Sequence, residues 1–199
     1  MQKTVNIIYK QKKRFEICKE WAMWPIKRWN NVLFSDESKF NLFNSDGRTM
    51  IWRSPGERLN FKNMVPTVKH GGGSVMVWGS MSSKGVGELV FIEGTMDSVK
   101  YVRILSENLD MSVEKAGLDN GFVFQQDNDP KHKSKFTMKY FSENNITLLN
   151  HPPQSPDLNP IENLWGYIDL ELKKKKIKNI GELKRVILEI WNNIDASFL

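Results

Sequence analysis

Cysteine and histidine are scarce in this sequence. One cysteine, Cys18, and three histidines are present among 199 residues. A single thiol excludes an intrachain disulfide framework and suits a reducing compartment. The few histidines and the cysteine also lack the spacing of a zinc site. We expect Cys18 to be a small core residue.

Long apolar runs are also lacking. No stretch approaches the roughly 20 apolar residues that are needed to span a bilayer, and the apolar run near Val5 is too short for a signal peptide. We therefore expect an intracellular, soluble protein that makes no membrane contact.

The glycine run 71–73 lacks the residues that two catalytic motifs need. No Gly-Lys-Ser/Thr follows it, which excludes a phosphate-cradling loop. Gly-x-Ser-x-Gly is absent from the sequence, which excludes the nucleophile elbow of an esterase. We interpret this run, with His70 before it, as a flexible hinge beside a strand.

Basic residues outnumber acidic ones, with 29 Lys and Arg against 23 Asp and Glu and a net charge of +6. This balance favours a polyanionic partner such as nucleic acid. The lysine run 173–176, with Lys178, leaves two interpretations open. It is either a patch for nuclear import or DNA-backbone contact, or a solvated helix end that the helix dipole favours.

Apolar patterning predicts an α/β domain with a mixed sheet flanked by helices. Short strands separated by turn residues come first, and the second half alternates strand and helix, so we expect antiparallel strands first and parallel strands later. The expected strands are 32–36, 40–43, 49–53, 74–81, 87–92, 122–126 and 146–149. The segment 53–69 is expected to be an irregular insertion.

Helical spacing predicts the remaining elements. A helical segment at about 9–29 carries Trp21, Trp24 and Trp29, which are expected to be core residues rather than base-stacking ones. Asp97 can cap a helix to about residue 116, and a further helix follows Ser134. Two later helices carry one apolar stripe each. The stripes are Ile161, Leu164, Trp165, Ile168, Leu172 and Leu183, Val186, Ile187, Ile190, Trp191.

Three carboxylates occupy positions where chemistry can use them. Asp36 and Asp127 each follow an apolar strand, and Glu162 falls in the first turn of a helix. Each also has a local structural explanation: Asp36 and Asp127 suit turns, and Glu162 suits a capping box with Asn159. A calcium loop that starts at Asp127 is excluded, because His132 stands where its glycine is required.

The three acids lie in blocks that resemble the signature blocks of Tc1-type transposases, in the Tc1/mariner superfamily. The blocks are Ser-Asp36-Glu-Ser-Lys-Phe, Gln-Gln-Asp127-Asn-Asp-Pro-Lys-His and Pro-Pro-Gln-Ser-Pro-Asp-Leu-Asn-Pro-Ile-Glu162-Asn-Leu-Trp. Their order, and the 34 residues between Asp127 and Glu162, are typical of the Tc1 branch. The resemblance implies an RNase H-like fold, with a helical lead-in at 1–29 and a catalytic domain at 30–199.

The resemblance also implies an activity, metal-dependent DNA cleavage and strand transfer in cut-and-paste transposition. Asp36, Asp127 and Glu162 would then be the catalytic residues and hold Mg²⁺, with Mn²⁺ as a substitute and two ions expected. The partner would be double-stranded DNA, at transposon ends and TA target sites, in the nucleus. A homodimer is a second partner that the resemblance allows, through the 53–69 insertion.

Four basic residues after Asp127 are candidates for DNA-backbone contact near the scissile phosphate: Lys131, His132, Lys133 and Lys135. A solvated loop is the alternative. We expect the helix-turn-helix DNA-binding modules of the family to be absent, and the C-terminus to be shortened.

Two other functions stay open. One is an inactive or adopted transposase fragment that only binds DNA or protein. The other is a different RNase H-like nuclease, such as one that acts on RNA–DNA hybrids, which substrate preference would separate.

Overall fold

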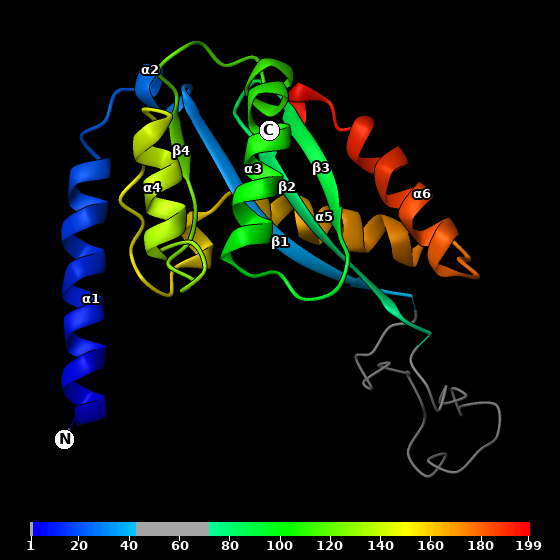
Figure 1. Cartoon of the computed structure of the whole chain (residues 1–199), viewed down its shortest axis with the longest axis horizontal. Helices are drawn as coiled ribbons and strands as arrows, with labels where there is room; N and C mark the ends of the chain where they lie inside the picture. The colour runs from blue at the N-terminus through cyan, green and yellow to red at the C-terminus, as the bar shows by residue number, and fades with distance from the viewer. Residues whose placement is uncertain (1, 43–71) are drawn as a thin grey trace, which may run out of the picture.

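The computed structural model describes residues 2–42 and 72–199, with side chains from Lys10 onwards. In this part of the chain, five strands form one sheet in the order β3-β2-β1-β4-β5 (Figure 1). They are β1 (Val32–Asn41), β2 (Ser74–Met81), β3 (Val86–Ile92), β4 (Val123–Gln125) and β5 (Thr147–Leu148). β1 pairs antiparallel with β2 and parallel with β4, which confirms the expected mixed sheet.

Helices cover both faces of the sheet (Figure 1). α3 (Ser98–Lys115) and α4 (Lys135–Glu143) pack on one face, and α5 (Ile161–Lys173), α6 (Ile180–Asn192) and the end of α1 (Gln2–Trp21) pack on the other. The short helices are α2 (Ile26–Trp29), η2 (Pro156–Leu158) and η3 (Ala196–Phe198). None of the helices described is long and apolar enough to cross a membrane.

β1 is buried on both faces, as its apolar start predicts. Val32, Phe34 and Phe40 join the core under α5 and α6, whereas Leu33 joins the core under α3 and α4. Side chains alternate along a strand, so even-numbered β1 residues face α5 and odd-numbered ones face α3. This alternation decides where the polar residues of the same strand point.

The helix predictions are confirmed in their main features. Every residue of the two predicted stripes on α5 and α6 is buried. The Asp97 side chain caps α3 by accepting a hydrogen bond of 2.8 Å from the Lys100 backbone N–H. Trp21 is buried, and its ring centroid lies 5.4 Å from that of Trp29, which confirms the core interpretation of these aromatics.

Two expected boundaries are wrong. β1 continues to Asn41, so Phe40 belongs to this strand and not to a separate one. The pairing with β2 runs unbroken through the polar residues 35–39 to Phe40, which pairs with Val75. The lead-in breaks after Trp21 and resumes at Ile26, because Pro25 cannot continue a helix. The expectations for 43–71, which include the strand 49–53 and the insertion, lie outside the described residues.

Gly79 makes room for the aromatic core beside the site. It lies opposite Asp36 in the β1–β2 ladder. A Cβ there would lie 2.7 Å from Trp165 and 3.0 Å from Trp191. Because two large rings cannot both retreat from a close-packed core, we expect Gly79→Ala to lower the free energy of unfolding by about 1–3 kcal/mol.

Gly166→Ala is the matched control for this substitution. Gly166 lies within α5, and no atom approaches the place of its Cβ within 4 Å. Alanine is favoured over glycine within a helix, so this variant should be more stable by about 0.5–1 kcal/mol. Urea denaturation measures both changes, and equal effects of the two variants would contradict the packing argument.

Candidate active site

The register of two parallel strands brings Asp36 and Asp127 to neighbouring backbone positions. Phe34 of β1 pairs with Gln125, the last residue of β4. Two residues further along, the two chain segments carry Asp36 and Asp127. The parallel pairing of β1 and β4 therefore brings the backbone positions of the two acids to the same edge of the sheet.

Ser35 attaches the elements that carry the other two acids to β1. Its hydroxyl donates to the Gln125 carbonyl at 2.8 Å, and its N–H donates to the Gln125 side-chain oxygen at 3.2 Å. Its carbonyl accepts a hydrogen bond of 3.2 Å from the Asn159 side chain. Asn159 leads into α5, which carries Glu162 in its first turn. Hydrogen bonds of Ser35, next to Asp36, thus position the segments that carry Asp127 and Glu162.

The capping box of Asn159 and Glu162, the structural alternative for Glu162, is not formed. Pro160, and not Asn159, is the N-cap of α5, and no side chain caps this helix. The Asn159 side chain is turned to Ser35, and its backbone N–H donates to the Pro156 carbonyl at 2.8 Å. The Glu162 side chain therefore does not cap α5, and this residue lines a pocket instead.

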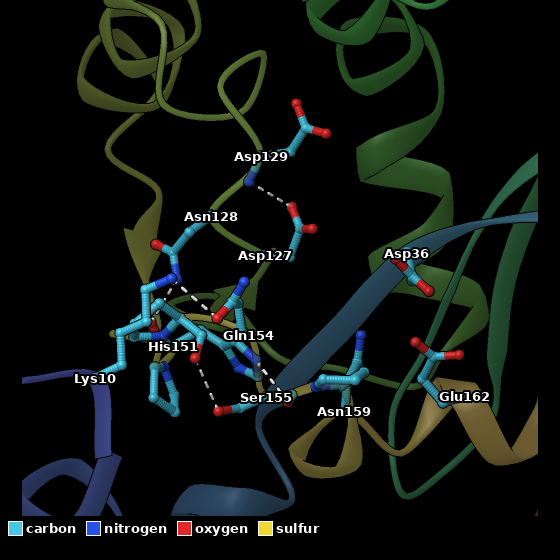
Figure 2. Close-up of a pocket in the computed structure, with 13 residues that line it drawn as sticks. Lys10, Asp36, Asp127, Asn128, Asp129, His151, Gln154, Ser155, Asn159 and Glu162 are labelled. Atoms are coloured by element: carbon cyan, nitrogen blue, oxygen red, sulfur yellow. Dashed lines mark hydrogen bonds between the residues drawn. The ribbon is translucent and has the colours of Figure 1, made fainter. Parts of the chain in front are cut away.

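All three acids line this pocket, which has a volume of about 510 Å³ (Figure 2). Figure 2 shows the carboxylates of Asp36 and Glu162 turned toward each other, whereas Asp127 lies farther off, beside Asp129. Within residues 2–42 and 72–199, no three His, Cys, Asp or Glu side chains lie close enough to enclose a metal ion. The structure thus brings two of the acids together and places the third across the pocket.

Asp36 and Glu162 repel each other as anions. Burial raises the pKa of Asp36 to about 7, and the charges of Glu37 and Glu162 add to the rise. Burial also raises the pKa of Glu162. The Trp165 indole N–H donates to Asp36 Oδ2 at 3.1 Å and orients this carboxylate. Carboxylate oxygens are the hard ligands that Mg²⁺ prefers. A divalent cation between these two acids would also neutralise their mutual repulsion.

Asp127 is in the opposite electrostatic state. Its Oδ1 lies 2.5 Å from Nδ1 of His132, whose Nε2 lies 3.1 Å from Glu37. Burial raises the pKa of Asp127, but the His132 and Asp129 hydrogen bonds outweigh burial and lower it to about 2. Burial likewise opposes the charge on His132, and the bonds to Asp127 and Glu37 outweigh it and raise the pKa to about 8.

The four predicted DNA contacts divide into two pairs. Lys131 and His132 are engaged inside the protein, since Lys131 Nζ lies 3.3 Å from Glu37 and His132 is buried. Lys133, on the loop, and Lys135, the first residue of α4, are exposed. DNA contact stays a prediction for all four, and the exposed pair is the one that a phosphate can reach without rearrangement.

The lysine run at the end of α5 makes ion pairs within the protein. Its partners are acids of α5 and α6: Lys173 with Asp169 at 2.5 Å, Lys174 with Glu171 at 2.5 Å and Lys175 with Glu189 at 3.5 Å. These pairs are typical of a solvated helix end. The interpretation as a nuclear-import or DNA patch stays a prediction.

α1 contacts the segment 154–157 at one wall of the pocket. The sequence analysis did not predict these contacts. Lys10 Nζ donates to the Gln154 side chain at 2.9 Å, and the Arg14 guanidinium forms a two-point pair with Asp157. These partners are more than 140 residues apart, so no local pattern relates them. Charged residues on the exposed side of the lead-in were the only available signal.

Comparison with known proteins supplies a family. A model of the DDE superfamily endonucleases matches residues 31–184. The sequence is 42% identical over 194 residues to the Tcb1 transposase of Caenorhabditis briggsae, covering 98% of this chain and 71% of that protein. It is also 42% identical over 177 residues to the Tc1 transposase of Caenorhabditis elegans, covering 88% of this chain and 64% of that protein.

Solved structures show the same fold. A Mos1 transposase paired-end complex with the left transposon end matches with a TM-score of 0.79 at 19% identity, covering 96% of this chain and 56% of that one. A Mos1 paired-end complex with Mn matches with a TM-score of 0.76 at 18% identity, covering 95% and 55%. The Mos1 catalytic domain matches with a TM-score of 0.66 at 16% identity, covering 95% and 81%. The sheet order and its helices are those of an RNase H-like domain, as expected.

The raised pKa of Asp36 predicts how Asp36→Asn changes stability. Its folded-state value of about 7 lies above the ordinary 3.8, so ionised Asp36 destabilises the fold increasingly as the pH rises between these values. In the absence of divalent ions, the variant should gain on the order of 1–3 kcal/mol at about pH 8 and nothing at about pH 4. Urea denaturation at both pH values measures this gain.

Asp127→Asn is the matched control, and its effect should have the opposite sign. The folded-state pKa of about 2 lies below the ordinary 3.8, so ionised Asp127 stabilises the fold at neutral pH, and this contribution is lost as the pH falls toward 2. We expect this variant to be less stable than the wild type at neutral pH. A stabilising Asp127→Asn, or an Asp36→Asn gain that is equal at both pH values, would contradict these electrostatic assignments.

Proposed function

This chain belongs to the DDE superfamily endonucleases, among the Tc1/mariner transposases, and we propose that it is the catalytic part of a cut-and-paste DNA transposase. The observation that carries the proposal is that Asp36, Asp127 and Glu162, from three different elements, line one pocket. The reaction would cleave transposon ends with water and join the freed 3′ hydroxyl to target DNA at TA dinucleotides. Such work on chromosomal DNA would take place in the nucleus.

The proposed cofactor is Mg²⁺ or Mn²⁺, as the two ions that the family resemblance implies, and the acid pair Asp36 and Glu162 suits it. When bound, divalent ions would activate the attacking water and stabilise the leaving oxygen. Asp36, oriented by Trp165, and Glu162, on the rigid start of α5, would supply carboxylate oxygens. Asp127 would supply the third carboxylate from across the pocket. The Mos1 complex with Mn supports this choice of cofactor.

Glu162→Gln tests the proposal directly. Glutamine keeps the size of the side chain but not its charge, so nicking of supercoiled DNA with Mg²⁺ or Mn²⁺ should fall by about 100-fold or more, since even residues behind a metal ligand contribute 10–100-fold. Glu171→Gln is the control, because Glu171 lies on the same helix and pairs with Lys174 outside the pocket. Gel assays of nicking and melting temperatures would be compared for the three proteins.

A Glu162→Gln variant that nicks like the wild type would remove Glu162 from the metal site. If neither the wild type nor Glu162→Gln nicks DNA but both bind it, the alternative of a binding-only fragment gains support. The assay should then be repeated with a DNA-binding domain joined to the chain, because the chain spans 64% of the Tc1 transposase and 56% of the Mos1 chain.

Lys133 and Lys135 are the proposed DNA-backbone contacts. Each phosphate contact that is lost should reduce the slope of log affinity against log salt by about 0.9. We therefore expect Lys133→Ala and Lys135→Ala each to weaken binding to duplex DNA of any sequence and to lower this slope. Lys139→Ala is the control, since Lys139 is exposed on α4 and pairs with Glu143. An equal effect at Lys139 would indicate a general charge effect.

A further inference from the structure

A buried histidine connects two carboxylates behind the pocket. The His132 side chain is 3% exposed, and its two ring nitrogens lie 2.5 Å from Asp127 Oδ1 and 3.1 Å from Glu37 Oε1. Both nitrogens are therefore used by acids, one on β1 and one just after β4. A ring fixed at both nitrogens has one orientation relative to the sheet.

The protein around His132 prevents the ring from turning away. The Tyr101 ring of α3 lies against it, with centroids 4.1 Å apart. The Gln126 side chain donates to the His132 carbonyl at 3.1 Å and accepts from the Tyr101 hydroxyl at 2.7 Å. The backbone N–H of His132 donates to the Asp129 carbonyl at 2.9 Å. The loop is held at the backbone as well as at the ring.

These contacts hold one oxygen of Asp127 and spare the other. The His132 ring and the Asp129 backbone N–H both bind Oδ1. Among the described residues, Oδ2 accepts no hydrogen bond, and Figure 2 shows it on the side of Asp127 that faces Asp36. When one oxygen of a carboxylate is held by hydrogen bonds, the other oxygen points in a fixed direction.

We propose that Glu37 and His132 are positioning residues, which fix Asp127 through Oδ1 so that Oδ2 is presented to the pocket. This proposal rests on the proposed function, in which Asp127 is a metal ligand. Glu37 follows Asp36 on β1 and faces the opposite side of the sheet, so one strand supplies both a pocket carboxylate and the anchor for the second one. Neither residue touches the reacting atoms.

Long-range charge and the nearby lysine offer competing explanations for any effect at Glu37. Lys131 Nζ lies 3.3 Å from Glu37 and 2.9 Å from Asp129. If Glu37 acted only by its charge, Glu37→Gln would be as harmful as Glu37→Ala. If it acted through the lysine, Lys131→Met would have the same effect. The positioning role instead requires an acceptor for His132 Nε2–H, which glutamine retains and alanine lacks.

The first measurement is NMR of the imidazole N–H protons, which the three histidines of the chain keep simple. His132→Gln identifies the signals of this ring. We expect slowly exchanging, downfield-shifted ring N–H signals for His132, and a shift of the Nδ1–H signal in Glu37→Ala that is largely reversed in Glu37→Gln. The proposal would be overturned if the ring N–H protons exchange as fast as those of an exposed histidine. It would also be overturned if the Nδ1–H signal does not shift in Glu37→Ala.

The second measurement is Mn²⁺ affinity of the protein alone, by electron paramagnetic resonance of free Mn²⁺, with nicking assayed in parallel. Glu37→Ala should weaken Mn²⁺ binding and nicking by about 10–100-fold, Glu37→Gln should recover most of the loss, and Lys131→Met should not reproduce it. Glu93→Ala is the control, since Glu93 is an exposed acid whose carboxylate lies 3.7 Å from Lys184 Nζ.

The outcomes separate this proposal from the proposed function. Wild-type protein that binds Mn²⁺ with the expected Glu37 pattern but does not nick supports the positioning role and counts against the proposed function. If the wild type nicks and Glu37→Ala nicks equally well, the positioning role alone is overturned. A Glu37→Gln variant that binds Mn²⁺ as weakly as Glu37→Ala overturns it too. Wild-type protein that binds no Mn²⁺ overturns both.

Discussion

The alternation of side chains along β1 is the constraint on which the site depends. Asp36 and Glu37 are adjacent, so a strand must send them to opposite faces. On one face Asp36 meets Trp165 and Glu162, and on the other Glu37 meets His132. The strand can hold two acids at this point because each face has polar partners for one of them, from α5 on one side and from the loop between β4 and α4 on the other.

The hydrophobic core and the acid pair are coupled through one indole ring. Trp165 is buried on α5, packs over Gly79 and stacks on Trp191 with centroids 5.4 Å apart, yet its N–H reaches Asp36. The turn of α5 that sets this ring also sets Glu162. A shift of the helix against the sheet would therefore move both acids, and the rigidity of the core maintains the geometry of the pocket.

Periodicity predicted the elements, and motifs predicted the acids, but contacts distant in sequence were beyond both. The stripes on α5 and α6 are confirmed because burial follows the helical period. The capping box failed since Asn159 has a better partner, the carbonyl of Ser35, which lies 124 residues away in the chain. Likewise, His132 and Lys131 follow Asp127 in a loop that looks solvated, and only the fold reveals that Glu37 binds both.

The pKa values of Asp36 and Asp127 differ because their surroundings differ, although the strand register gives the two residues neighbouring backbone positions. Asp127 has a cationic partner in His132, and its pKa is about 2, so it is ionised at all physiological pH values. Asp36 is buried, its hydrogen-bond donors are the neutral indole of Trp165 and the Glu37 backbone N–H, and two acids lie near it, so its pKa is about 7. Its charge is therefore sensitive to any cation that enters the pocket. The pocket therefore combines one carboxylate that is ionised throughout with one that titrates near neutral pH.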